Sequence, residues 1–168
     1  LPAIQEQLPI GTLHASYPMP GAASCRKGMA WIWDGVHFEY LWPAADTGGS
    51  DNDNSCVLRI EANGRSIIMT GDISERAESQ LLAQQGVRLS SEIIVAPHHG
   101  SRTSSSASFL QAVKPKLALV SSGFQNRFRH PNHQVVQRYR VQGAKLVNSV
   151  DSGWAELESG PGGWRWLN

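Results

Sequence analysis

The stretch that decides the fold is Ser66-Ile67-Ile68-Met69-Thr70-Gly71-Asp72. Its apolar run, residues 67–69, predicts a strand that is buried on both faces. A glycine follows and allows a sharp turn, so Asp72 is expected to project from the carboxyl end of the strand, where α/β sheets place their sites. The period then changes, and Ser74 is expected to cap a helix over residues 74–85.

Hairpin patterns precede this strand, and strand–helix alternation follows it. Two dipeptides are typical of two-residue hairpin turns, Asp34-Gly35 and Asn63-Gly64. The first lies between expected strands over 30–33 and 36–41, and the second between expected strands over 55–62 and 65–70. Further strands are expected over 92–96, 117–121, 145–149, 154–158 and 164–167, with a short helix before Pro115 and a helix over 131–142. The polar loop over 44–54 is expected to be unpacked. This order predicts an α/β fold, with a mixed sheet layered by helices.

The composition excludes several classes of protein. The chain has 168 residues, of which 40% are hydrophobic and 17% charged, so it is neither too short nor too polar to bury a core. The net charge of +1 requires neither a nucleic acid nor a membrane as partner. No apolar run approaches the ~18 residues of a membrane span, and no signal-peptide pattern is present. Because the chain opens at Leu1 in mid-pattern, we expect it to be a fragment of a longer protein.

Two motifs at strand ends could carry chemistry, and each also has a structural interpretation. Asp72 is either a site carboxylate or an ordinary helix-capping one. The motif Pro97-His98-His99-Gly100-Ser101 follows the strand over 92–96. Adjacent histidines point in different directions, so one is expected to be a metal ligand and the other either to support a ligand by hydrogen bonding or to face the substrate. The alternative is a pair of hydrogen-bonded structural histidines.

A third motif is basic. It reads Asn126-Arg127-Phe128-Arg129-His130-Pro131-Asn132-His133, and its two histidines are three apart, a spacing that can place both on one face of a helix. Four arginines and no acid lie between residues 123 and 143, at positions 127, 129, 138 and 140. This local charge suits a phosphate-bearing substrate. The alternative is a solvated basic helix face.

Five motifs occur in an order that resembles one family. They are Asn-Asp-Asn-Ser at 52–55 followed by Cys-Val-Leu, Thr-Gly-Asp at 70–72, Pro-His-His-Gly-Ser at 97–101, Asn-Arg-Phe-x-His-Pro at 126–131 and Asp-Ser-Gly at 151–153. From about residue 25 to residue 154 or beyond, the chain resembles the second half of the metallo-β-lactamase-like domain of ComEC-type competence proteins, which internalise DNA. The resemblance makes residues 1–168 a single, partial domain.

The resemblance implies an αββα sandwich with a dinuclear metal site at one sheet edge. In it, Asp72 matches the carboxylate that bridges the metals, and His99 matches the histidine ligand, with His98 beside it. His130 matches a histidine that faces the substrate, and His98 and His130 are the expected catalytic residues. One departure is large. The main ligand cluster of the superfamily is His-x-His-x-Asp-His or, in this family, a variant with Asp in the middle. Neither form occurs in the sequence, and the cluster would lie upstream of Leu1. The fragment itself is therefore expected to be inactive and to bind metal weakly.

For the parent protein we expect hydrolysis of phosphodiester bonds in one DNA strand by two divalent ions, either Mn²⁺ or Zn²⁺. Ser101, Asn126, Arg127 and Arg129 are the expected substrate-binding residues. Two alternatives stay open: a hydrolase of a small phosphodiester such as a phosphocholine headgroup, and a non-catalytic scaffold or DNA-holding module of a transport protein. The expected partners are DNA, the missing N-terminal half of the domain and the membrane channel of the parent, on the periplasmic side of the inner membrane.

The two cysteines, Cys25 and Cys56, are too few for a four-thiolate zinc site. A disulfide between them is expected if the strand of Cys56 lies beside the segment of Cys25. A DNA-uptake protein works in an oxidising compartment, which favours the bridge. The alternative is two buried free thiols.

Overall fold

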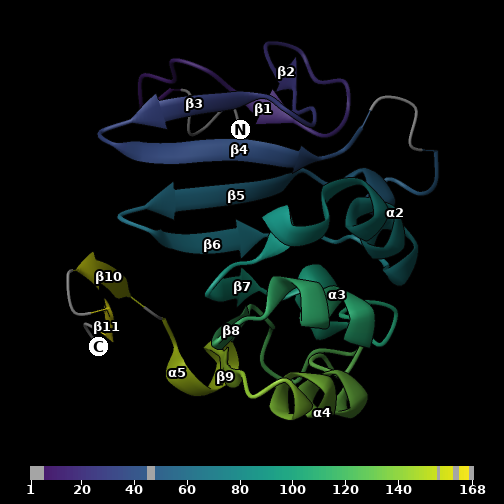
Figure 1. Ribbon diagram of the computed structural model, residues 1–168. Coiled ribbons are helices and arrows are strands. Elements are labelled where there is room, and N and C mark those ends of the chain that lie inside the picture. The colour runs from purple at the N-terminus through teal and green to yellow at the C-terminus, as the bar shows by residue number, and fades with distance from the viewer. Residues whose placement is uncertain (1–5, 45–47, 155, 161–162, 167–168) are drawn as a thin grey trace.

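A seven-stranded mixed sheet forms the centre of the molecule, which confirms the predicted α/β fold. The structure, a computed structural model, describes residues 6–44, 48–154, 156–160 and 163–166. Strands β3 to β6 pair antiparallel and β6 to β9 pair parallel (Figure 1). In sheet order the strands are β3 (Ala30–Trp33), β4 (Val36–Trp42), β5 (Val57–Ala62), β6 (Arg65–Met69), β7 (Ile93–Val95), β8 (Leu117–Val120) and β9 (Lys145–Asn148).

Both predicted hairpins are present, and their turn residues explain why. Asp34 and Gly35 have φ values of 49° and 77°, and Asn63 and Gly64 have φ values of 52° and 73°. Two consecutive residues with positive φ produce the turn whose twist matches that of the flanking strands, and Asp-Gly and Asn-Gly adopt it at low cost. These two turns therefore fix the register of β3 with β4 and of β5 with β6.

The connections between the parallel strands carry the helices. They are α2 (Glu75–Gln85) with η2 (Gly86–Leu89), then η3 (Pro97–Gly100) with α3 (Ala107–Val113), and α4 (His133–Val141). The Ser74 side chain accepts a hydrogen bond from the backbone N–H of Arg76, so the predicted cap of α2 is confirmed. The helix predicted over 131–142 begins later, at His133, because Asn132 is its N-cap. His130 thus precedes the helix and does not share a helix face with His133.

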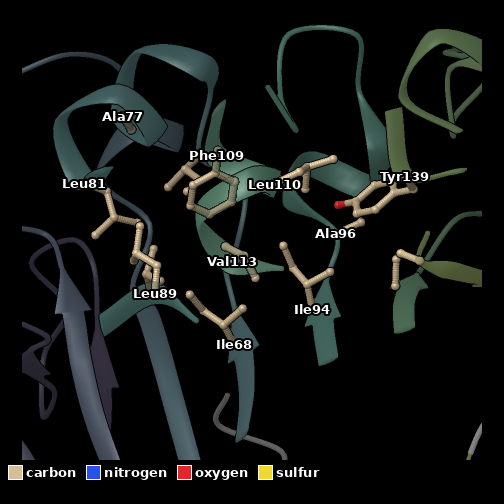
Figure 2. Packing of buried hydrophobic residues seen from close by; sticks show 14 of the residues in the cluster. Ile68, Ala77, Leu81, Leu89, Ile94, Ala96, Phe109, Leu110, Val113 and Tyr139 are labelled. Atoms are coloured by element: carbon tan, nitrogen blue, oxygen red, sulfur yellow. The ribbon is translucent and has the colours of Figure 1, made fainter. Parts of the chain in front are cut away.

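The hydrophobic core lies between these helices and one face of the sheet. Figure 2 shows Leu81, Phe109 and Tyr139 pointing from the helices toward Ile68 and Ile94 on the strands. All five side chains are fully buried. Burial of this kind is worth roughly 1.5–3 kcal/mol for each large apolar side chain. The helices therefore hold the carboxyl ends of β6, β7 and β8 in fixed relative positions.

The opposite face of the sheet is also apolar, and strand register shows this directly. Residues paired across neighbouring strands share a face, so two rows cross the sheet on the side away from the core. One row contains Trp31, Phe38, Ile60, Ile67, Ile93 and Leu117, and the next contains Tyr40, Leu58, Met69, Val95, Leu119 and Val147. Most of these side chains are only half-buried. We call these two rows the free face.

The free face corrects one expectation about the fold-deciding stretch. Burial on both faces was predicted for residues 67–69, but only Ile68 is fully buried, and Met69 is 43% exposed. The physical reason is that Ile68 faces the helices, whereas Ile67 and Met69 lie in the two rows of the free face. Such an apolar run is typical of a strand with two covered faces. In this structure the face toward the helices is completely covered, and the free face is not.

A second correction concerns the polar loop over 44–54, of which residues 45–47 lie outside the described residues. It was expected to be unpacked, yet it contains η1 (Asn52–Asn54), and Asp53 is only 7% exposed. The indole N–H of Trp42 donates to the Asp53 carbonyl at 2.6 Å, and the Asp53 carboxylate accepts from the hydroxyl of Ser74. Burial by itself would raise the pKa of Asp53, but the hydrogen bonds from Ser74 and Ser50 together outweigh it and lower that pKa.

Short elements lie at both ends of the chain. Strands β1 (His14–Ala15) and β2 (Ala23–Ser24) pair parallel, and β10 (Leu157–Gly160) and β11 (Gly163–Trp166) form a hairpin outside the main sheet. The strands predicted over 154–158 and 164–167 correspond to this hairpin, except that residues 155 and 167 lie outside the described residues. A short helix, α5 (Ser149–Ser152), follows β9. None of the helices in the described part of the chain is long and apolar enough to cross a membrane.

Candidate active site

Three polar segments meet at the carboxyl ends of the parallel strands β6, β7 and β8. Asp72 follows β6, the His98–His99 pair follows β7, and Ser121 follows β8. The backbone N–H of His98 donates to the carbonyl of Gly71 at 3.0 Å, which ties the first two strand ends together. Strand order therefore brings together residues that are far apart in the sequence, as predicted for sites of α/β sheets.

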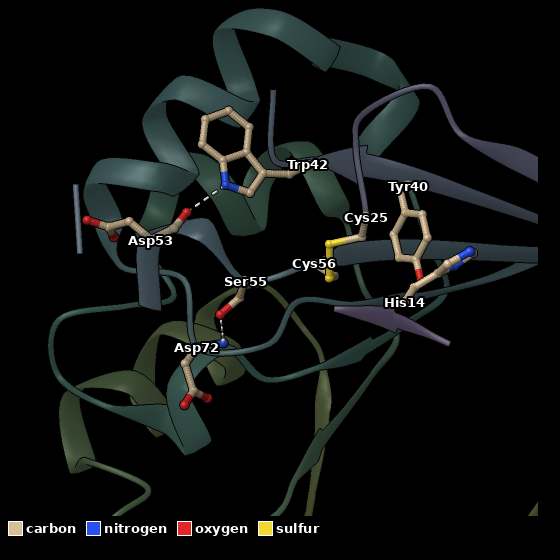
Figure 3. The surroundings of a disulfide bond; sticks show 8 residues. All are labelled: His14, Cys25, Tyr40, Trp42, Asp53, Ser55, Cys56 and Asp72. Atoms are coloured by element: carbon tan, nitrogen blue, oxygen red, sulfur yellow. Dashed lines mark hydrogen bonds between the residues drawn. A yellow bond between two sulfur atoms is a disulfide. The ribbon is translucent and has the colours of Figure 1, made fainter. Parts of the chain in front are cut away.

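The turn that presents Asp72 depends on Gly71 and Ser55. Gly71 has a φ of 56°, and a Cβ atom at this position would lie 2.7 Å from the Cβ of Ser55. The backbone N–H of Asp72 donates to the hydroxyl of Ser55 at 3.1 Å (Figure 3). The N-cap of α2 is Ser74 and not Asp72. Its side chain is 39% exposed, so it is available to a ligand.

His99 lies between a carbonyl group and the Asp72 carboxylate. Its Nδ1 is 2.8 Å from the Ser121 carbonyl oxygen, and its Nε2 is 3.5 Å from Oδ1 of Asp72. Because a carbonyl can only accept, Nδ1 must carry the proton, and in the neutral ring the lone pair of Nε2 faces Asp72. Metal-bound histidines are commonly oriented by such a carbonyl contact. The geometry therefore suits His99 as a ligand beside Asp72.

The backbone of the histidine pair is unusual. His98, His99 and Gly100 have φ values of 50°, 56° and 78°, in the left-handed region that non-glycine residues rarely adopt. Residues held in this way cost of order 1–3 kcal/mol each and concentrate at functional sites. Gly100 also packs tightly, because a Cβ there would lie 2.7 Å from the Cβ of Pro131. The turn is thus held in place by the segment that follows β8.

That segment brings His130 to the site. Asn126 holds it in place, because its side-chain oxygen accepts from the His130 backbone N–H at 2.8 Å and its amide donates to the His130 carbonyl at 2.8 Å. The rings of His130 and His98 are 6.0 Å apart, edge to face. Burial lowers the pKa of His130, and the nearby charges of His98 and His99 lower it further, whereas Asp72 raises it. The two predicted catalytic histidines are therefore neighbours.

A pocket of about 380 Å³ opens between these residues. It is lined by His99, Ser121, Ser122, Gly123, Asn126, Phe128 and His130. The ring of Phe128 stacks against that of His130 at 5.6 Å. A pocket of this size can hold a small organic ligand or one unit of a polymer.

The predicted substrate-binding residues occupy different environments. Asn126 lines this pocket, whereas Arg127 and Arg129 are exposed beside it, with the Arg127 guanidinium 4.6 Å from the centre of the Phe128 ring. Ser101 is only 8% exposed, and its hydroxyl lies 3.1 Å from that of Thr103. Its proposed contact with substrate stays a prediction.

One arginine of the basic segment is already paired. Arg138 donates to the Glu75 carboxylate at 2.9 Å and to the Ser104 carbonyl at 2.9 Å. It therefore holds α4 to the start of α2, and its charge is largely neutralised there. The basic segment could not show this pairing in the sequence, because Glu75 lies 63 residues away in the chain.

The donor set at the site fits part of a metal centre. Asp72 offers a carboxylate and His99 an imidazole, which are ligands that Zn²⁺ and Mn²⁺ accept. Within the described ranges, no group of three or more His, Cys, Asp or Glu side chains is placed to hold a metal ion. A tight site usually needs about three or four protein ligands, so further donors are required.

The predicted disulfide is present and lies close to this site. Cys25 and Cys56 are bridged, with their Cα atoms 6.0 Å apart (Figure 3). Cys56 directly follows Ser55, whose hydroxyl accepts from Asp72. The bridge thus anchors the N-terminal segment to the residue that supports Asp72.

These features define an α/β protein with an Asp–His site at its strand ends. Comparison with known proteins finds relatives over most of the chain. It is 41% identical over 159 residues to Competence protein ComA of Neisseria gonorrhoeae, covering 94% of this chain and 23% of that protein. It is 33% identical over 129 residues to Recombination protein 2 of Haemophilus influenzae, covering 77% and 16%, respectively. It is also 30% identical over 118 residues to ComE operon protein 3 of Bacillus subtilis, covering 70% and 15%.

The chain is therefore a homologue of competence proteins, and it spans less than a quarter of the length of each of these three relatives. No protein-family model matches the chain. The competence part of the predicted resemblance is thus confirmed. The assignment to a metallo-β-lactamase-like domain stays a prediction.

Proposed function

We propose that this chain belongs to a DNA-uptake protein and forms half of a metal-dependent phosphodiesterase domain that degrades one DNA strand. The observation that carries this proposal is the position of His99 between the Ser121 carbonyl and the Asp72 carboxylate. A histidine with a fixed tautomer beside a carboxylate, at the ends of parallel strands, is suited to metal-assisted hydrolysis. The names of the relatives support a role in competence.

In this proposal Asp72 and His99 hold divalent metal, with further ligands from outside this sequence. The metal, when bound, polarises the phosphate and lowers the pKa of bound water. The neighbouring rings of His98 and His130 are the side chains available to exchange a proton with the substrate. Asn126 keeps the His130 backbone in place through two hydrogen bonds.

The exposed loop beside the site supports a nucleic-acid substrate. Arg127 and Arg129 are exposed and close to Phe128, which is 62% exposed. Arginine side chains contact phosphates, and an exposed aromatic ring can stack on a base of a single strand. A small phosphocholine substrate would instead need an aromatic cage around its ammonium group, and Phe128 is the single Phe, Tyr or Trp among the described residues that line the 380 Å³ pocket.

The free face supports the proposal that the domain is partial. Two adjacent rows of apolar side chains cross the sheet there, and most of them are only half-buried. A second sheet packed on this face would complete an αββα sandwich, with sheets about 10 Å apart. We propose that the preceding part of the parent protein supplies that sheet together with the missing ligands.

The disulfide supports the proposed location. Disulfides persist in oxidising compartments and are rare in the cytoplasm. The Cys25–Cys56 bridge therefore favours the periplasmic side of the inner membrane, where the parent protein would feed the surviving strand to its membrane channel.

One observation favours the non-catalytic alternative, a scaffold or DNA-holding module. The described residues contribute Asp72 and His99 to the candidate metal site and no larger group of donors. Metal titration tests the first part of the proposal. In calorimetry with Mn²⁺ or Zn²⁺ this chain is expected to bind weakly, and Asp72→Ala is expected to abolish binding. A submicromolar stoichiometric site that survives Asp72→Ala contradicts the assignment.

Cleavage tests the second part, in a protein extended upstream to include the rest of the domain. Asp72→Asn and His99→Gln are each expected to lower the rate of single-strand cleavage by at least about 100-fold, on the scale of lost electrostatic stabilisation of a transition state. His133→Gln is the matched control, because His133 is exposed at the start of α4. Unchanged cleavage in both site variants, or no cleavage by the unmodified extended protein, would favour the scaffold.

A further inference from the structure

A second and larger pocket adjoins the candidate active site. Its volume is about 690 Å³, and His98 forms part of its wall, whereas His99 lines the 380 Å³ pocket described above. The rest of its wall comes from the η1 segment, the start of α2, the turn after Gly100 and one side of α4. The two pockets therefore meet at the histidine pair.

Three arginines line this pocket, and two of them are near carboxylates. Arg76, Arg102 and Arg138 line it, together with a single acid, Glu75. Arg138 is bound by Glu75 at 2.9 Å, and Arg76 lies 3.6 Å from the Asp53 carboxylate. Arg102 is exposed and has no hydrogen bond or ion pair with any residue that the structure describes. Among the described residues, the charge of Arg102 is thus left without a partner.

Neutral donors line the same pocket as this cation. The side-chain amides of Asn52 and Gln134 line the pocket and, within the described residues, have no partner. The hydroxyl of Thr103 also lines it and contacts Ser101 at 3.1 Å. A guanidinium with amide and hydroxyl donors around it is the chemistry that binds tetrahedral oxyanions, because guanidinium offers paired N–H groups and cannot lose its proton.

We propose that this pocket binds a phosphate group through Arg102, with Asn52, Thr103 and Gln134 as hydrogen-bond donors. The proposal deepens the proposed function and rests on it, because it makes the pocket the neighbouring subsite for the substrate of the Asp72–His99 site. The wall formed by His98 connects the two, since the ring of His98 lies 6.0 Å from that of His130. The bound phosphate is either an internal phosphodiester of a strand or a terminal or free phosphate.

Binding without metal tests the proposal. Inorganic phosphate is titrated into the 168-residue chain, and backbone amide signals are followed by NMR. We expect shifts at Arg102, Thr103 and His98 that saturate together. Arg102→Ala is expected to weaken binding about 10-fold or more, as expected for loss of a charged hydrogen bond, and Arg102→Lys to weaken it less. Arg140→Ala is the matched control, because Arg140 is exposed on α4 and does not line the pocket.

Single-stranded oligonucleotides identify the source of the phosphate. The first probe is a thymidine hexamer without terminal phosphates, and the second carries a 5′-phosphate. If Arg102→Ala weakens binding of both and reduces the salt slope by about 0.7, the pocket holds an internal phosphodiester. If it weakens only the second probe and inorganic phosphate, the pocket holds a terminal phosphate.

Two results would overturn the proposal. One is phosphate binding that Arg102→Ala leaves unchanged, and the other is a set of phosphate shifts confined to the loop that contains Arg127 and Arg129. Failure of the pocket is distinguishable from failure of the proposed function, because Asp72→Asn is expected to remove cleavage in the extended protein and to preserve metal-free phosphate binding.

Discussion

Substitution of Gly100 by alanine gives the sharpest test of how the histidine turn is held. Gly100 has a φ of 78°, and an added Cβ would lie 2.7 Å from the Cβ and 3.1 Å from the Cα of Pro131. Left-handed backbone costs a residue with a Cβ roughly 1–2 kcal/mol. Overpacking against a neighbour costs about 1–3 kcal/mol more. Gly100→Ala is therefore expected to lower the free energy of unfolding by about 2–5 kcal/mol.

Gly143→Ala is a matched control for this substitution. Gly143 has almost the same φ, 76°, but a Cβ there would meet nothing within 4 Å. It therefore carries the backbone cost without the contact, and the difference between the two variants isolates the packing of Gly100 on Pro131. That difference is expected to be about 1–3 kcal/mol.

Urea unfolding measures both free energies, with the slope checked to be constant across the variants. A second readout is the affinity for metal, which Gly100→Ala is expected to reduce because it displaces the neighbouring His99, and which Gly143→Ala is expected to leave unchanged. Equal destabilisation by both substitutions, within about 0.5 kcal/mol, would refute the reasoning that Pro131 holds the turn.

Three further predictions concern the rest of the molecule. The double variant Cys25→Ser/Cys56→Ser is expected to lose about 3–4 kcal/mol of unfolding free energy, because the bridge closes a loop with a sequence separation of 31. Equal urea midpoints of the unmodified protein with and without reductant would contradict this. Lys116 and other donors lower the pKa of Glu92 in the folded protein below its ordinary value of 4.5. The Glu92 carboxylate is therefore expected to stabilise the fold fully above pH 4.5 and to lose this effect as the pH falls through the lower pKa of the folded protein. In Glu92→Gln the unfolding free energy should therefore decrease less steeply as the pH falls below 4.5. The same pH dependence in the variant and the unmodified protein would contradict this prediction. Met69→Lys, on the free face, is expected to lower the unfolding free energy of the upstream-extended protein more than that of this chain, because Met69 is 43% exposed here. Equal destabilisation of the two proteins in urea unfolding would exclude a covered face.

Local rules of sequence predicted the order of elements well. Asp34-Gly35 and Asn63-Gly64 set the hairpins because they accept positive φ, and Ser74 set the start of α2 because its hydroxyl accepts a backbone N–H. The burial of Asp53 was not predictable in this way. Its partner Ser74 lies 21 residues further along the chain, so composition alone made the loop look unpacked.

The candidate site was predictable where it depends on strand ends and unpredictable where it depends on tertiary contacts. Asp72 and His99 each follow an apolar strand, and the parallel order of these strands brings Nε2 of His99 to 3.5 Å from Oδ1 of Asp72. Ser55 and Ser121 also belong to the site. Ser55 ends the Asn-Asp-Asn-Ser motif, but that motif does not show that the Ser55 hydroxyl accepts from the Asp72 backbone, and no motif marks the Ser121 carbonyl. The role of Gly71 was predictable in part, because it follows a strand and allows a turn. Its close contact with Ser55 was not predictable, because it depends on tertiary packing.

The incomplete site and the incomplete burial have a common explanation under the proposed function. The site stands at the carboxyl ends of strands whose one face is covered by helices, and its described donors are one carboxylate and one imidazole. The same strands carry two rows of apolar side chains on the other face, most of them only half-buried. A second sheet packed there would bring its own strand ends to the same edge, next to Asp72 and His99. One missing layer would then supply both the apolar cover and the remaining ligands, whereas a scaffold that never held metal would need only the cover.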